Sequence, residues 1–267
     1  MLLLFGLMAA ETLVFPEQPD IFLEIHGVDK PANSVYYLAP HQPEHVINRY
    51  LARKVKKRGE KFLILRQSGD RQIFLKLDGV TVAVDPNRIF TPRGCESTLL
   101  RQNPDLAHQP ETLAKAKAKA VRLGEFIMDQ MGGISKGSVI VAIHNNTNGY
   151  DGDGKNGIGT ISIDRYQKRL DRGAKYILSI HAGSHDEDDL FFITEQADFY
   201  ALSKAGFNVV LQHPQVAELA DEDDGSLSVL SEMRDVRYLN VEAQRGPDHK
   251  RRQKKMLKAL FRLLENP

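Results

Sequence analysis

The chain has 267 residues, of which 42% are hydrophobic, and this amount of apolar material favours one sizeable domain over residues 1–267. Its 36 lysine and arginine residues nearly balance its 35 aspartate and glutamate residues, so the net charge of +1 gives no support to a nucleic acid partner. Cys95 is the single cysteine, which excludes an intrachain disulfide and a four-cysteine zinc site and leaves histidine and carboxylate as metal ligands.

The first ten residues, Met1 to Ala10, are apolar but lack the basic region that begins a signal peptide. They are also shorter than the roughly 20 residues that span a bilayer, so we expect no stable membrane insertion. Two interpretations remain open. Residues 1–20 are an N-terminal extension or the remnant of an export signal, which would place the protein in the periplasm or outside the cell. Otherwise they are an ordinary apolar terminus of a cytoplasmic protein.

Short runs rich in β-branched and aromatic residues alternate with longer runs of helical periodicity. The runs predict strands at residues 21–25, 34–38, 61–65, 72–77, 81–84, 138–143, 176–180, 190–193, 208–211 and 238–241. They predict helices at residues 44–57, 110–131, 195–205 and 248–264. Residues 139–143 are apolar throughout, as in a strand covered on both faces, so we expect a layered α/β fold. Residues 145–159 are polar and predict a loop directly after that strand, where α/β enzymes place their chemistry.

His41 and Glu44 form a His-x-x-Glu pair immediately after a predicted strand. A spacing of three residues lets an imidazole and a carboxylate meet at one ion, although such a pair alone is more often a surface or capping feature. His144 ends the most apolar predicted strand, and Glu242 follows another. Alone, each would fit a polar cap or a salt bridge, but a strand end is also where a third ligand and a catalytic carboxylate would lie.

A further motif, Asp-Pro-Asn-Arg-Ile-Phe at residues 85–90, again follows a predicted strand. Pro86 ends the ladder of hydrogen bonds, so Asn87 and Arg88 would project from the end of the strand. A guanidinium beside an amide suits recognition of a carboxylate, because the planar fork can bind both oxygens. A turn with an ordinary arginine salt bridge is the alternative.

The order of these motifs resembles the zinc carboxypeptidase superfamily, and most closely its branch of aspartoacylases and succinylglutamate desuccinylases. The resemblance extends from His41 to Glu242 and rests on short motifs, of which residues 85–90 are similar to the Asp-Leu-Asn-Arg-x-Phe element of that branch. It implies a three-layer α/β sandwich with a central mixed, mostly parallel sheet flanked by helices. The interval between His144 and Glu242 is longer than that family's pattern.

By this resemblance, one zinc ion would be held by His41, Glu44 and His144. Asn87 and Arg88 would hold a substrate carboxylate. The resemblance assigns the general acid and base to Glu242, and polarisation of the scissile carbonyl to an upstream arginine, for which Arg71 is the candidate and Arg66 the less favoured substitute. The pocket tyrosine of the peptidases has no clear counterpart, although Tyr150 and Tyr166 lie in the downstream region.

These features predict a zinc-dependent hydrolase of an amide bond next to a free carboxylate, acting on a peptide, a peptidoglycan stem peptide or another small molecule. An N-acyl amino acid deacylase of the aspartoacylase type is the alternative within enzymes. A metal-binding or ligand-binding module without turnover is the alternative outside them. His181 and His185 could also bind a metal, but the acidic residues after them favour a solvated loop.

Overall fold

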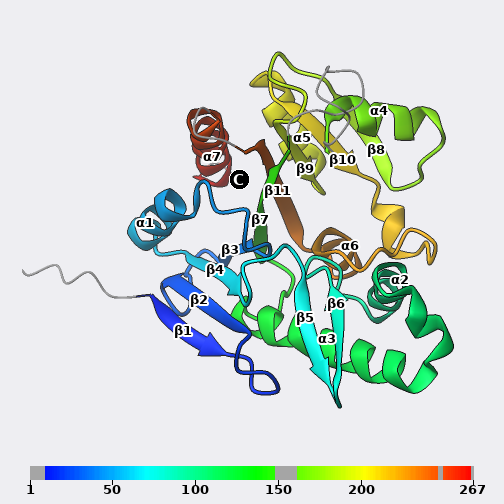
Figure 1. Ribbon diagram of the computed structural model, residues 1–267. Coiled ribbons are helices and arrows are strands. Elements are labelled where there is room, and N and C mark those ends of the chain that lie inside the picture. Colours follow the sequence, from blue (N-terminus) through cyan, green and yellow to red (C-terminus); the bar gives the residue numbers. More distant parts are fainter. Residues whose placement is uncertain (1–9, 148–160, 246–248, 266–267) are drawn as a thin grey trace, which may run out of the picture.

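The computed structural model describes residues 10–147, 161–245 and 249–265. Within this part, nine strands form one sheet in the order β1-β2-β4-β3-β7-β11-β9-β10-β8, and β5 pairs with β6 in a separate hairpin (Figure 1). The strands are β1 (Glu11–Val14), β2 (Phe22–Gly27), β3 (Val35–Ala39), β4 (Lys61–Arg66), β5 (Ile73–Leu77), β6 (Val80–Val84), β7 (Val139–Asn146), β8 (Ile177–His181), β9 (Leu190–Ile193), β10 (Asn208–Gln212) and β11 (Arg237–Gln244).

The centre of the large sheet is parallel and its flanks are mixed. Strands β4, β3, β7 and β11 run parallel to one another, whereas β2 is antiparallel to β4 and β9 is antiparallel to β11. The carboxyl ends of the four central strands therefore meet at one edge, which is where ligands bind in open α/β sheets. The predicted mixed sheet is confirmed.

Alternate residues of the central strands enter two separate apolar clusters. In β7, Ile140 and Ala142 belong to one cluster, and Val141 and Ile143 belong to the other. Helices α2 (Pro92–Gln102), α3 (Pro110–Gln130), α4 (Ile163–Asp171) and α6 (Leu227–Met233) supply side chains to the first cluster. Helices α1 (Asn48–Arg58), α5 (Gln196–Lys204) and α7 (Lys250–Glu265) supply the second. Helices thus cover both faces of the sheet.

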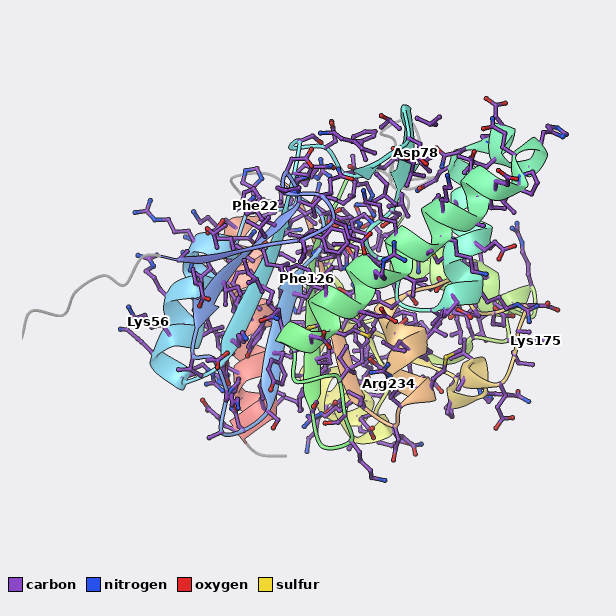
Figure 2. The ribbon with its side chains drawn as sticks, turned by 90° about the horizontal axis from the view of Figure 1, so that it is seen from below. Phe22, Lys56, Asp78, Phe126, Lys175 and Arg234 are labelled. Carbon is purple, nitrogen blue, oxygen red and sulfur yellow. The ribbon has the colours of Figure 1, made fainter. Side chains whose placement is uncertain are left out.

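Helix α3 runs across the molecule in Figure 2, and its Phe126 lies with its ring centroid 5.5 Å from that of Phe15. Phe15 follows β1, an edge strand that pairs antiparallel with β2, so residues 11–15 are built into the sheet and its core. The sequence analysis did not predict β1. No helix in the described ranges has both the length and the apolar character needed to cross a membrane.

Each predicted strand and helix is present, but three helices were missed. Their length does not explain this, because α2 and α4 have 11 and 9 residues, the same lengths as the predicted helices α1 and α5. Their N-caps are the better signal, since Thr91, Ser162 and Ser226 each accept a hydrogen bond from the backbone N–H three residues later.

Two predicted boundaries near the site were wrong. Strand β7 continues to Asn146, where a loop was expected to begin at Asn145, and β11 continues to Gln244 beyond its expected end at Val241. Both strands are longer than predicted because β7 and β11 pair with each other over these residues, with Glu242 opposite His144 and Gln244 opposite Asn146. Most of the predicted loop, residues 148–159, lies outside the described residues.

Candidate metal centre

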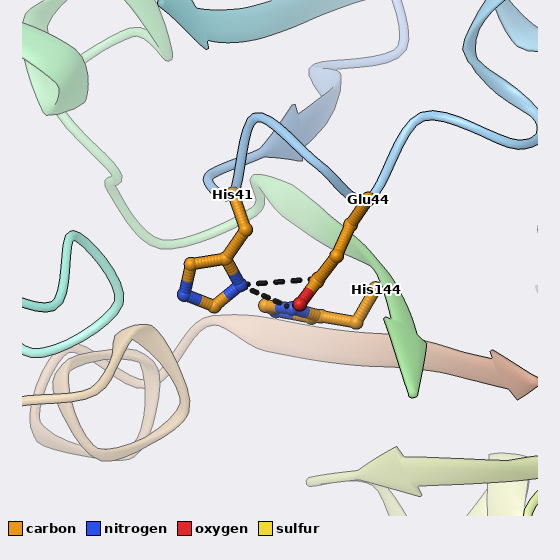
Figure 3. A group of neighbouring side chains, drawn as sticks. All are labelled: His41, Glu44 and His144. Carbon is orange, nitrogen blue, oxygen red and sulfur yellow. Dashed lines mark hydrogen bonds and ion pairs between the residues drawn. The ribbon is translucent and has the colours of Figure 1, made fainter. Parts of the chain in front are cut away.

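Three side chains from two distant parts of the sequence meet at the carboxyl edge of the central strands (Figure 3). His144 Nδ1 lies 2.9 Å from Glu44 Oε2, and His41 Nδ1 lies 3.1 Å from the same oxygen. The two Nδ1 atoms are 3.1 Å apart. All three residues are buried, and their ligand atoms lie within 4.8 Å of one another, so this group could hold a metal ion.

The sheet explains why these residues meet. Strands β3 and β7 are adjacent and parallel, with Leu38 opposite Ala142, so the chain leaving β3 passes beside the end of β7. The backbone N–H of Glu44 donates to the carbonyl of His41 at 3.1 Å, which closes a turn and brings both side chains to one side. Helix α1 was expected to begin at Glu44 but begins at Asn48, because Glu44 belongs to this turn.

Asp85 orients His41, a role that the sequence analysis did not assign. His41 Nε2 lies 2.9 Å from Asp85 Oδ1, which also accepts the backbone N–H of Asn87 at 2.9 Å. Burial raises the pKa of Asp85, but the hydrogen bond from His41 and the nearby positive charge of Arg71 outweigh burial and hold the pKa well below its usual range. An ionised Asp85 can accept the Nε2 proton of His41, and this contact would make Nδ1 the electron-pair donor of His41 towards a bound cation.

Glu44 is ionised for similar reasons. Burial raises the pKa of its carboxyl, but the charges and hydrogen bonds of His41 and His144 hold it well below its usual value. Its other oxygen, Oε1, pairs with the guanidinium of Arg71. Only one carboxylate oxygen therefore faces the two imidazoles.

Glu242 lies in β11, directly opposite His144 in register. It is buried and accepts a hydrogen bond from Asn240 Nδ2 at 3.1 Å. Burial and the negative charge of Glu44 raise the pKa of Glu242, while His144 and Arg71 oppose this rise without cancelling it. A carboxyl with a raised pKa beside a metal-ligand cluster is suited to accept and return a proton.

A cavity of about 860 Å³ opens from this cluster and is lined by Glu44, His144 and Glu242. Its described wall is rich in cations and phenols. These are Arg71, Arg88, Arg165, Arg169, Arg245, Tyr166, Tyr176 and Tyr238. The sequence analysis found Arg71, Arg88 and Tyr166 but missed the other residues of this set. No motif marks them, and the fold alone brings them to one wall.

Arg71 lies at the mouth of the cluster, where its half-exposed side chain is paired with Glu44. Arg66, the less favoured candidate for the upstream arginine, instead pairs with Glu24 of β2 at 2.9 Å, and it does not line the cavity. Between the two, the geometry favours Arg71.

Asn87 and Arg88 both line the cavity, as their motif predicts. Asn87 Oδ1 is buried and has no hydrogen-bond partner among the described residues. Arg88 Nη1 pairs with Asp224 Oδ2 at 2.5 Å, so a substrate carboxylate would have to replace Asp224. Gly225 holds this segment against the motif, because a Cβ atom at Gly225 would lie 2.5 Å from the carbonyl oxygen of Arg88.

The second pair of histidines, His181 and His185, differs in its surroundings from His41 and His144. His185 packs against Phe207, with 4.8 Å between ring centroids, and neither His181 nor His185 joins a metal-ligand group in the part of the chain that the structure describes. The prediction of a solvated acidic loop was wrong, because Asp188 and Asp189 are only 0% and 3% exposed. Tyr150 lies outside the described residues.

No family model matches the chain, and no curated protein matches it. Two solved structures are similar at low identity. Succinylglutamate desuccinylase from Chromobacterium violaceum has a TM-score of 0.45 and 13% identity, over 97% of this chain and 70% of that chain. N-formylglutamate amidohydrolase from Ralstonia eutropha JMP134 has a TM-score of 0.38 and 12% identity, over 91% of this chain and 97% of that chain.

Proposed function

We propose that the protein is a zinc-dependent hydrolase that cleaves an amide bond next to a free carboxylate, with the three-layer architecture of the zinc carboxypeptidases. The observation that carries this proposal is the convergence of His41 Nδ1, His144 Nδ1 and one oxygen of Glu44, with Glu242 opposite His144. Two imidazoles and one carboxylate are a ligand set of hydrolytic zinc sites.

The residues present fit a zinc ion. The contact between Asp85 and His41 Nε2 makes Nδ1 the electron-pair donor of His41, and ligating histidines commonly have such a carboxylate partner. Arg71 occupies the second oxygen of Glu44, which leaves Oε2 for a single bond to a cation. A bound zinc ion would polarise the scissile carbonyl and acidify an attacking water molecule.

Glu242 has the position and the raised pKa of a general base that becomes a general acid. It would accept a proton from water at its carboxylate and later donate that proton to the leaving amine. Asn240 holds Glu242 Oε1, so the other oxygen, Oε2, would exchange the proton. Arg71, at the mouth of the cluster, would offset negative charge on the carbonyl oxygen.

The cavity wall supports an anionic substrate. Five of its described residues are arginines and five are carboxylates, and Arg71 and Arg88 pair with two of these carboxylates, Glu44 and Asp224. Arg169 donates a 2.9 Å hydrogen bond to the hydroxyl of Tyr176, so its guanidinium is not taken up by a carboxylate of the wall in that contact. Asn87 Oδ1 would accept an N–H group of the substrate, and Arg88 would exchange Asp224 for the substrate carboxylate. A C-terminal peptide residue, a peptidoglycan stem peptide and an N-acyl amino acid each carry such a carboxylate.

One observation favours the deacylase alternative over an extended peptide substrate. The cavity volume of about 860 Å³ lies within the range of roughly 300–1,000 Å³ that is usual for small-molecule sites. The proposal of a binding module without turnover gains no such support, because such a module has no need for a buried carboxyl of raised pKa beside the metal ligands.

The test is metal analysis of the purified protein, followed by a screen of acyl amino acids and peptides with and without a chelator. Glu242→Gln is expected to lower the turnover number by about 10²-fold or more and to retain zinc, since Glu242 moves protons and is not a ligand. Glu111→Gln, at an exposed position on α3, is the control. Loss of zinc from Glu242→Gln, or full activity of that variant, would contradict the proposal.

A further inference from the structure

An acidic segment, Asp186 to Asp189, directly precedes β9. The ligand oxygens of Asp186, Glu187 and Asp188 lie within 4.8 Å of one another. The surrounding chain fixes the segment, since Asn208 Nδ2 donates to the carbonyls of Asp186 and Asp189 at 2.7 Å and 3.0 Å. Holding several carboxylates so close costs free energy unless a positive charge compensates them.

Strand register brings two amide side chains to this segment. Gln244 lies opposite Asn146, and both share the cavity-facing side of the sheet with His144 and Glu242, which are two residues earlier on the same strands. Antiparallel pairing places Leu190 opposite Glu242, so the chain entering β9 passes Asp188 beside Gln244. Two direct contacts agree with this arrangement. Asn146 Nδ2 donates to the carbonyl of Asp188 at 2.5 Å, and the backbone N–H of Gln244 donates to Asp189 Oδ1 at 3.1 Å.

The side-chain oxygens of these two amides are buried acceptors that receive no hydrogen bond from the described residues. Asn146 and Gln244 are 6% and 3% exposed, and neither Asn146 Oδ1 nor Gln244 Oε1 has a hydrogen-bond partner in the described part of the chain. The donor contact to Asp188 fixes the orientation of the Asn146 amide, because a flipped amide would place oxygen against oxygen. A buried acceptor without a donor costs about 1–3 kcal/mol, which a bound cation would recover.

We propose that Asp186, Glu187, Asp188, Asn146 and Gln244 form a second cation site, built from oxygen ligands and selective for Ca²⁺. Carboxylate and amide oxygens are the ligands of hard divalent cations, and a loop that supplies many of them with flexible geometry suits Ca²⁺ better than Mg²⁺. Glu187 and Asp188 have other interactions, so the proposal rests on the two amide oxygens and on the clustering of the ligand atoms. Arg252, which pairs with Asp186 at 2.5 Å, is half exposed and supplies a single positive charge.

This site is chemically distinct from the His41, Glu44 and His144 cluster, because it has no nitrogen ligand. Asn146 and Gln244 lie one row beyond His144 and Glu242 on β7 and β11, about 7 Å further along the strands. Asn146 also lines the cavity, so a bound Ca²⁺ would fix the cavity wall next to the proposed zinc site.

The test is a calorimetric titration of the full-length protein with CaCl₂, after chelation and reloading with one equivalent of zinc. We expect one Ca²⁺ per chain with a Kd between about 10⁻⁶ and 10⁻³ M. Gln244→Met, which removes the oxygen and keeps the volume, should weaken binding about tenfold or more, and Gln244→Glu should tighten it. Gln109→Glu adds the same charge at an exposed position and should leave the Kd unchanged.

Two results would overturn the inference. One is the absence of both heat and a Ca²⁺-dependent rise in Tm in the wild-type protein up to about 10 mM CaCl₂, well above the weakest affinities of such sites. The other is a Kd that neither Gln244 variant changes. If Gln244→Met does not fold, Asp186→Asn at its partly exposed position serves as the second variant, with the same expected weakening.

Discussion

The contact between Asp85 and His41 offers a sharp test of the metal centre, because Asp85 does not itself join the ligand cluster. Asp85→Asn keeps the shape of the side chain and an oxygen that can accept both His41 Nε2–H and the backbone N–H of Asn87, each now at 2.9 Å from Asp85 Oδ1. The change removes the negative charge and replaces the other oxygen, Oδ2, by an NH2 group. That charge strengthens His41 Nδ1 as an electron-pair donor and favours the tautomer that ligation requires.

The expected loss of zinc affinity follows from this role of Asp85. Removal of a carboxylate partner of a ligating histidine typically lowers metal affinity by about 10-fold to 100-fold. This loss corresponds to about 1.4–2.8 kcal/mol of binding free energy. We expect a change near the upper end, because His41 is buried and the side chain of Asp85 is only 17% exposed, so the charge is weakly screened.

The assay is competition for zinc between the protein and a chromogenic chelator, with circular dichroism to show that the variant is folded. Asp105→Asn, at an exposed position, is the matched control and should bind zinc as the wild type does. A folded Asp85→Asn protein with unchanged zinc affinity would refute the reasoning, since it would mean that His41 does not ligate the metal through Nδ1.

Three further predictions test the cluster, the cavity and the fold. His144→Ala should reduce bound zinc well below one ion per chain in elemental analysis, and full retention would remove His144 from the ligand set. Asp224→Asn should free Arg88 and lower KM for a carboxylate substrate with little change in kcat, so an unchanged or higher KM in steady-state kinetics would argue against that exchange. Burial raises the pKa of Glu232 from 4.5 to about 7, so its contribution to stability is present below about pH 4.5 and is lost as pH rises through 7. Glu232→Gln should therefore flatten the fall in unfolding free energy between pH 5 and pH 8, by about 1–2 kcal/mol for this partly exposed carboxyl, and an unchanged pH profile in urea denaturation would contradict it.

Much of the candidate centre could be predicted because its signals are local. His41 and Glu44 are three residues apart, and His144 ends the most apolar strand of the sequence. Parallel strands present their carboxyl ends at one edge, so side chains that follow such strands meet without any knowledge of distances. The 3.1 Å separation of the two Nδ1 atoms is what that hypothesis required.

The ion pairs around the centre could not be predicted in the same way. The pairing of Arg88 with Asp224 joins residues far apart in sequence, and the same holds for the contact of Arg71 with Glu44. Many carboxylates could have served as partners, and only the packing of the loops selects one. Glu232 is a further case, because burial, the main cause of its raised pKa, comes from its place in the fold.

The sequence by itself determined the type of each element that it predicted, the alternation of strands and helices, and which polar side chains stand at the strand ends. The tertiary structure decided the strand register, which extended β7 and β11 by several residues and placed Gln244 beside Asn146. It also decided the burial of Asp188, which the run of acidic residues had indicated to be solvated. The physical reason is that apolar periodicity reports how each element faces the core, whereas pairing and desolvation depend on which distant strands become neighbours.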